Sequence, residues 1–136
     1  MLIILYSCLL SYMLFFSTCI APLVNSTLNR ENSSKLLRKI FPRNFIFGGI
    51  VSFLIIVLSL YQKSLFSLLM SSLIFIFFVV NLYYLVPKIN LEADTTIKSK
   101  SYSKKFKILH LFSVVLYLIQ MILSLIFIVF YLIFNN

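Results

Sequence analysis

Residues 44–87 read NFIFGGIVSFLIIVLSLYQKSLFSLLMSSLIFIFFVVNLYYLVP and contain a single charged side chain, Lys63. One α-helix of this length would extend about 66 Å, roughly twice the hydrocarbon thickness of a bilayer. The stretch therefore predicts two apolar helices joined by a turn at residues 61–64. A lysine in the middle of a bilayer costs about 3 kcal/mol, so the turn is expected to place Lys63 at the membrane surface.

Two further apolar stretches flank this pair, and residues 1–29 and 108–136 carry no Asp, Glu, Lys or Arg. Each is long enough for the roughly 20 residues that cross a bilayer as a helix. The chain is 62% hydrophobic and 11% charged, with a mean hydropathy of +1.07, whereas soluble domains are about 25% charged. We therefore expect one all-α membrane domain over residues 1–136, a compact bundle of four helices at about 1–24, 43–62, 64–87 and 107–134.

Residues 33–42, SSKLLRKIFP, combine apolar residues at helical spacing with a basic opposite face. This pattern predicts a short amphipathic helix between the first two spans, capped by Ser33 or Ser34 and lying in the headgroup region with its apolar side toward the membrane. Pro42 is expected either to end this helix or to begin the second span. Residues 89–107 have low hydrophobicity and predict a solvated connector between the last two spans.

The connecting segments differ in charge, and the positive-inside bias of short loops predicts the orientation. The second connection holds Lys63 alone, while the first and third hold eleven basic residues: Arg30, Lys35, Arg38, Lys39, Arg43, Lys88, Lys98, Lys100, Lys104, Lys105 and Lys107. The first and third loops are therefore expected to be cytoplasmic and both termini to lie outside, in a plasma membrane or a bacterial inner membrane.

The net charge of +9 comes from residues beside the spans, which predicts attraction to anionic lipid headgroups and argues against nucleic-acid binding. The expected headgroup contacts are Lys35, Arg38, Lys39, Arg43, Lys104, Lys105 and Lys107. Each span also carries one face suited to close helix contact, so a second copy of the chain or another membrane protein is a possible partner. The expected contact faces are Ser7, Ser11, Leu14, Thr18 and Pro22; Gly48, Ser52, Ile55 and Ser59; Ser67, Ser71, Ile74, Phe78 and Asn81; and His110, Ser113, Tyr117, Gln120 and Ser124.

Groups for catalysis are sparse, because the three acidic residues all lie outside the predicted spans. No general acid/base pair, catalytic residue or metal site is predicted, and no cofactor is expected. Cys8 and Cys19 are too far apart along one helix to form a disulfide and are expected to be buried thiols. His110 is the one ionisable side chain in a predicted span. It is expected either to hydrogen-bond Asn81 or Asn44, or to bind a cofactor as a weak candidate.

Three stretches give a family resemblance: FFSTCIAPLVNSTLNRENSSKLLRKIFPRNF (15–45), NLYYLVPKIN (81–90) and FKILHLFS (106–113). They resemble the DUF4149 family, the transmembrane protein 205-like proteins, at the motif positions Pro22, Phe41, Pro42, Phe45, His110 and Ser113. The chain departs from the family pattern where Asn44 replaces a tyrosine and Leu111 a glycine. The resemblance implies four spans and no established biochemical activity.

The function predicted from these features is that of a small, non-enzymatic packing, interaction or accessory protein of the membrane, with a basic cytoplasmic face. Two alternatives remain open at this point. One is a haem- or redox-associated four-helix membrane protein that uses His110, and the other is a small-molecule transporter that works as an oligomer.

Overall fold

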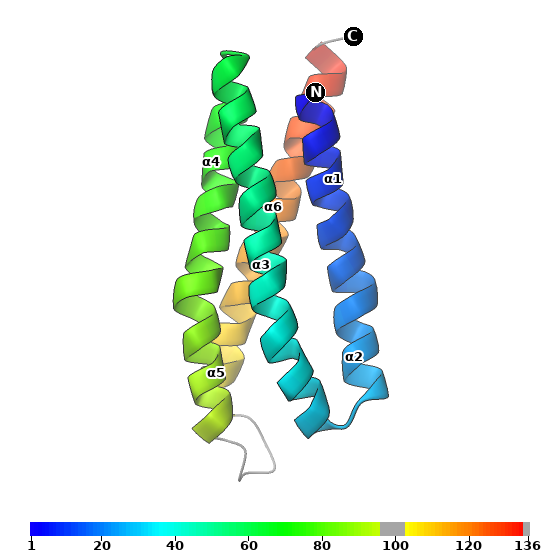
Figure 1. Cartoon of the computed structure of the whole chain (residues 1–136), viewed down its shortest axis with the longest axis vertical. Coiled ribbons are helices and arrows are strands. Elements are labelled where there is room, and N and C mark those ends of the chain that lie inside the picture. Colours follow the sequence, from blue (N-terminus) through cyan, green and yellow to red (C-terminus); the bar gives the residue numbers. More distant parts are fainter. Residues whose placement is uncertain (96–102, 135–136) are drawn as a thin grey trace.

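The computed structural model of the chain describes residues 1–95 and 103–134, and all regular structure in these residues is helical. Four helical rods lie side by side (Figure 1). Each is long and apolar enough to cross a membrane: Leu2–Thr27, Arg30–Tyr61, Leu65–Thr95 and Lys104–Phe134. The prediction of an all-α, four-helix membrane bundle is confirmed, and the chain is a multi-pass membrane protein.

Two of the four rods contain a short π-helical segment. The first rod consists of α1 (Leu2–Phe15), the π-helix η1 (Phe16–Ile20) and α2 (Ala21–Thr27). The second rod is α3 (Arg30–Tyr61), and the third consists of α4 (Leu65–Val80), the π-helix η2 (Asn81–Leu85) and α5 (Val86–Thr95). The fourth rod is α6 (Lys104–Phe134). Successive rods run in opposite directions, so both termini and the α3–α4 turn lie at one end of the bundle (Figure 1).

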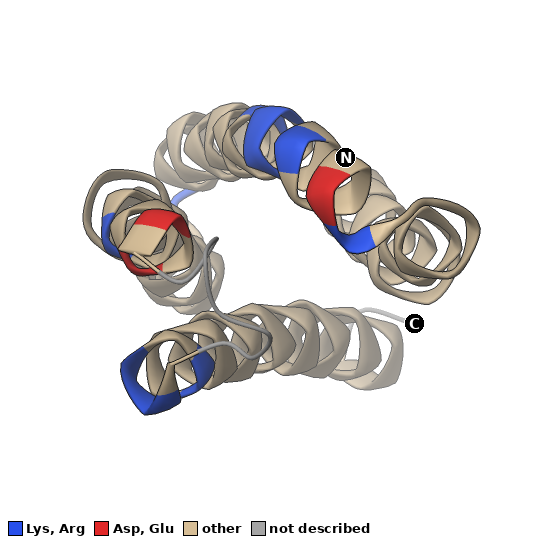
Figure 2. Ribbon diagram, turned by 90° about the horizontal axis from the view of Figure 1, so that it is seen from below, with Lys and Arg blue, Asp and Glu red and all other residues tan. Residues whose placement is uncertain are grey.

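The two ends of the bundle differ in charge (Figure 2). We call the end where α2 and α5 finish and α3 and α6 begin the basic end, because every described lysine and arginine except Lys63 lies toward it. The opposite end, which holds the α3–α4 turn and the two termini, is called the uncharged end because Lys63 is the one described Lys, Arg, Asp or Glu side chain there. Lys63 marks the turn at this uncharged end, as the sequence predicts.

The basic segment at residues 33–42 is not the separate helix that we expected, because it is the first part of α3. The cap is Asn29, whose side-chain oxygen accepts a hydrogen bond from the Asn32 N–H at 2.9 Å. The apolar stripe of the segment packs against the bundle, where Phe41 lies 5.6 Å from Phe16 between ring centroids. The stripe therefore faces neighbouring helices rather than the membrane surface, and Pro42 lies inside a continuous helix.

The connector between the last two spans is shorter than predicted. Helix α5 continues to Thr95 and α6 begins at Lys104, so both ends of the expected 89–107 connector are helical. Residues 96–102 of that connector lie outside the described residues.

The turn between α3 and α4 uses backbone hydrogen bonds in place of a capping side chain. The Ser64 N–H bonds to the Ser59 carbonyl at 3.0 Å and the Lys63 N–H to the Leu60 carbonyl at 3.2 Å. This is the Schellman arrangement, whose left-handed position usually holds glycine. Here Lys63 occupies it, with φ of 53°.

The contact faces predicted for the second, third and fourth spans are buried, with the exception of His110. The face predicted for the first span is wrong. Helix α1 and the start of η1 instead bury larger residues: Leu2, Tyr6, Leu9, Met13 and Phe16. Thr18 is exposed, and the hydroxyls of Ser17 and Thr18 both donate to the Leu14 carbonyl of their own helix. Hydroxyls satisfied in this way can face lipid at little cost, so a stripe of them does not mark a helix contact.

Candidate functional site

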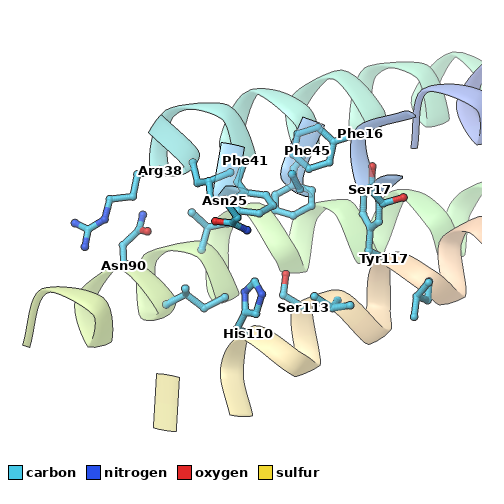
Figure 3. A pocket seen from close by; sticks show the side chains of 16 residues that line it. Phe16, Ser17, Asn25, Arg38, Phe41, Phe45, Asn90, His110, Ser113 and Tyr117 are labelled. Atoms are coloured by element: carbon cyan, nitrogen blue, oxygen red, sulfur yellow. The ribbon is translucent and has the colours of Figure 1, made fainter. Parts of the chain in front are cut away.

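A cavity of about 240 Å³ lies in the half of the bundle nearest the basic end (Figure 3). All four rods line it, so it is a central cavity and not a groove between two helices. The residues that line it are Phe16, Ser17, Ala21, Asn25, Leu37, Arg38, Phe41, Phe45, Val86, Ile89, Asn90, His110, Ser113, Val114, Tyr117 and Leu118.

Most of the family-motif positions predicted from the sequence meet at this cavity. Phe41 and Phe45 reach it from α3, and His110 and Ser113 reach it from α6. Pro22 directly follows the lining residue Ala21, whereas Pro42 is not among the lining residues. The resemblance therefore singled out residues that are distant in sequence and close in space.

Aromatic rings form the deep wall of the cavity (Figure 3). Tyr117 contacts Phe45 at 6.1 Å and Phe16 at 6.4 Å between ring centroids, both close to edge-to-face. The Asn44 side-chain amide donates to the Tyr117 hydroxyl at 3.3 Å, which fixes that ring. Such contacts stabilise a defined arrangement, so this wall is preformed.

His110 does not make the predicted hydrogen bond to Asn81 or Asn44, and each of these asparagines bonds another side chain. Ser113 donates to the Asn81 side-chain oxygen at 2.5 Å, and Asn44 donates to Tyr117. The His110 ring is exposed and stacks on Phe106, with 5.9 Å between centroids and 5° between planes. Among the described residues its nitrogens have no hydrogen-bond partner, so the ring presents free polar atoms to the cavity.

Two asparagines that line the cavity each follow a π-helical segment. In the first rod η1 is followed by Pro22 and Asn25, and in the third rod η2 is followed by Pro87 and Asn90. A proline inside a helix clashes with the backbone one turn earlier, and a π segment is one way to relieve that strain. The extra residue of the π segment also changes the direction of the side chains that follow it. Asn25 and Asn90, each three residues after a proline, both line the cavity.

Sequence reasoning missed these two asparagines, although a pattern for finding them exists. APLVN at residues 21–25 and VPKIN at residues 86–90 share a proline with an asparagine three residues later. The two stretches therefore form a short internal similarity. It marks equivalent positions in two rods of the bundle.

Ion pairs lie at the basic end of the bundle. Arg38 of α3 bonds Asp94 of α5 at 2.5 Å, and Lys105 bonds Glu92 at 2.6 Å. The third acidic residue, Glu31, pairs with Lys35 at 2.6 Å on the surface of α3. Three of the predicted headgroup contacts, Lys35, Arg38 and Lys105, are therefore paired within the protein.

The other predicted headgroup contacts remain available. They are exposed and have no ion-pair partner in residues 1–95 and 103–134: Lys39, Arg43, Lys104 and Lys107. The basic end thus carries an excess of positive charge that the protein does not neutralise itself.

Cofactor ligands do not gather at the cavity. Within the described ranges no group of three or more His, Cys, Asp or Glu side chains is placed to hold a metal ion. Cys8 and Cys19 are exposed free thiols, contrary to our expectation that they are buried. His110 is the one described histidine, so the structure gives no observation that favours the haem interpretation.

The family assignment rests on a match that covers the first three rods. The family described as a domain of unknown function, DUF4149, matches residues 4–96. The chain belongs to the DUF4149 family. The matched region contains the motif positions Pro22, Phe41, Pro42 and Phe45, and it ends before His110 and Ser113. No curated protein and no solved structure matches the chain.

Proposed function

We propose that this DUF4149 protein is a non-enzymatic membrane protein whose basic end recruits anionic lipid. The observation that carries the proposal is that four of the predicted headgroup contacts are exposed and have no ion-pair partner in the described part of the chain: Lys39, Arg43, Lys104 and Lys107. Each basic residue near an anionic membrane surface contributes about 1 kcal/mol of attraction. The three acidic residues pair with other cations of this end and so leave these four available.

The orientation proposed for the chain follows from the same charges. The basic end faces the cytoplasm and both termini face outward, since short loops rich in Lys and Arg are retained on the cytoplasmic side. A reporter enzyme that is active only outside the cytoplasm, fused after Asn136, is expected to be active. Activity of the same reporter when it is inserted after Thr96, and not at the C-terminus, would contradict this orientation.

The lipid proposal is tested with the full chain in phosphatidylcholine bilayers by electron paramagnetic resonance of spin-labelled lipids. We expect spin-labelled phosphatidylglycerol to be enriched at the protein surface over spin-labelled phosphatidylcholine. An attraction of about 1 kcal/mol corresponds to a roughly fivefold preference. The preference is expected to fall as salt is added, because exposed charges are screened.

Variants separate the four available cations from charge in general. Replacing Lys39, Arg43, Lys104 and Lys107 together by Gln is expected to lower the preference strongly. Lys63→Gln removes one charge at the opposite end and is the control, with the preference retained. Equal preferences in wild type and the fourfold variant would refute the proposal.

We also propose that the chain belongs to the transmembrane protein 205-like branch of the family. The motif of Phe41, Pro42 and Phe45, together with His110 and Ser113, supports this. An experimental structure of a member of that branch is expected to place its matching histidine and serine at a central cavity. A histidine on the outer surface of that bundle would contradict the placement.

A further inference from the structure

The central cavity has a polar end and an apolar end (Figure 3). Arg38, Asn90 and His110 lie toward the basic end of the bundle, and the aromatic rings of Phe45 and Tyr117 lie deeper. A ligand that matches this arrangement has a polar group at one extremity and an apolar body behind it.

The polar end offers hydrogen-bond donors. Within the described residues the Asn90 amide and the His110 ring have no hydrogen-bond partner, and Asn25 uses only its side-chain oxygen, which accepts from Ser33 at 2.7 Å. Arg38 gives one guanidinium N–H to Asp94 and keeps others. Donors from four rods that line the same cavity complement a group that only accepts hydrogen bonds, such as a carboxylate or a phosphate.

The apolar end suits one hydrocarbon chain. Its wall is made of aromatic and aliphatic side chains, including Phe41, Val86, Val114 and Leu118. The volume of about 240 Å³ is below the roughly 300–1,000 Å³ of sites that enclose drug-sized ligands. The cavity therefore has room for part of a single acyl chain and not for the two chains of a phospholipid.

We infer that the cavity binds a single-chain anionic lipid of the surrounding membrane, with its head at Arg38, Asn90 and His110 and its chain against the aromatic wall. This inference deepens the proposed function and rests on it for the source of the ligand. The exposed cations attract anionic lipid to the basic end, and the cavity selects a single molecule.

The test is native mass spectrometry of the full chain in an uncharged detergent with four probes. Palmitate and lysophosphatidylglycerol each have one chain and an anionic head, carboxylate or phosphate. Monopalmitoylglycerol has the same chain without charge, and dipalmitoyl phosphatidylglycerol has the charge with two chains. We expect a one-to-one complex with at least one of the single-chain anions. This anion is expected to bind about tenfold more tightly than the uncharged probe, because a hydrogen bond to a charged group contributes roughly the free energy of a tenfold difference in affinity.

Two adjacent substitutions on α6 locate the bound molecule. Val114 lines the cavity and Val115 does not, and both are 40% exposed. Val114→Phe fills the cavity and is expected to weaken binding about tenfold, because overpacking of this size carries such a penalty. Val115→Phe adds the same ring on the lipid side and is expected to bind like wild type. Equal binding by the two variants would overturn the inference.

Asn90→Ala with His110→Ala tests the polar end. This double variant is expected to lose about tenfold in affinity for the anionic single-chain probe and to keep its affinity for monopalmitoylglycerol. An equal loss for both probes, or binding of the two-chain probe alone, would overturn the inference. If circular dichroism shows that Val114→Phe is unfolded, Leu118→Phe replaces it and is judged by the same comparison.

The lipid proposal and the cavity inference can fail separately. Val114→Phe is expected to retain the preference for phosphatidylglycerol at the protein surface, because it leaves the exposed cations in place. Loss of selective surface binding in wild type would refute the proposed function. If Val114→Phe binds the single-chain anions as tightly as wild type does, the cavity inference alone is refuted.

Discussion

The uncharged end and the basic end are built from the same four rods, yet their interiors differ. At the uncharged end the rings of Tyr6 and Phe127 stack 3.9 Å apart, and the Tyr6 hydroxyl donates to the Ser67 carbonyl at 2.9 Å. The Ser59 and Ser67 hydroxyls lie 2.6 Å apart between α3 and α4. At the basic end the rods enclose a cavity with unpaired polar atoms. The comparison indicates that the uncharged end maintains the bundle and leaves the basic end free to bind.

The largest expected effect is a loss of stability when the packed end is truncated. Phe127 is 2% exposed and stacks on Tyr6, so Phe127→Ala is expected to lower the free energy of unfolding by about 3 kcal/mol. Phe41→Ala enlarges a cavity that already exists, so it is expected to lower the free energy of unfolding by only about 1 kcal/mol. The measurement is unfolding of detergent-solubilised protein by sodium dodecyl sulfate, followed by circular dichroism.

Phe112→Ala is the control for this pair, because Phe112 is 53% exposed on α6 and is expected to change stability little. Equal losses in the free energy of unfolding for Phe127→Ala and Phe41→Ala would show that the two ends are packed equally well. That result would contradict the difference between the two ends.

The next effect lies between the two ends, where α3 carries two adjacent glycines. A Cβ at Gly48 would overlap the Tyr12 hydroxyl and the Phe78 ring, whereas a Cβ at Gly49 would meet no atom within 4 Å. Gly48→Ala is therefore expected to destabilise the protein by about 2 kcal/mol. Gly49→Ala is expected to stabilise it by about 0.5 kcal/mol, because alanine favours the helix. Thermal unfolding that changes in the same direction for both variants would contradict the close approach of helices at Gly48.

The smallest effect is expected at the α3–α4 turn. Lys63 has a left-handed backbone conformation with φ of 53°, which glycine adopts without the steric cost of a Cβ. Lys63→Gly is expected to raise the free energy of unfolding by about 0.5 kcal/mol, since part of the gain is offset by the greater freedom of glycine in the unfolded chain. Lys63→Ala loses the same charge and keeps the strain, so it should show no such gain. A gain in both variants would assign the effect to charge.

Sequence periodicity predicted the packing of three rods because their inward faces combine small residues with a few larger ones. Ser52 and Ser59 of α3 and Ser67 and Ser71 of α4 are all buried, as that pattern predicts. The first rod follows another rule. Its inward face carries large side chains, and the hydroxyl groups of Ser17 and Thr18 bond to the Leu14 carbonyl of their own helix. The serine and threonine stripes of the first rod and of the other rods look similar in sequence. Which stripe is buried depends on the neighbouring helices, so the sequence pattern alone does not distinguish them.

The candidate site was predictable only in part. The resemblance singled out Phe41, Phe45, His110 and Ser113 without indicating that they share a cavity. The partner of His110 was predicted wrongly, because hydrogen-bond pairing depends on the depth and rotation of several helices at once. Asn25 and Asn90 each follow a π segment, and the hydrophobicity pattern of the sequence does not indicate such backbone distortions.

Those distortions have a consequence for how membrane helices of this kind are interpreted from sequence. A π segment inserts one residue, which offsets all later side chains by about 100° from a regular helix. On the third rod the buried series that includes Phe78, Asn81 and Leu85 is next followed by a buried residue at Ala93. The first and third rods therefore behave as two helical wheels in series with different phases. A single wheel drawn through either rod assigns the lipid-facing and inward positions of one half incorrectly.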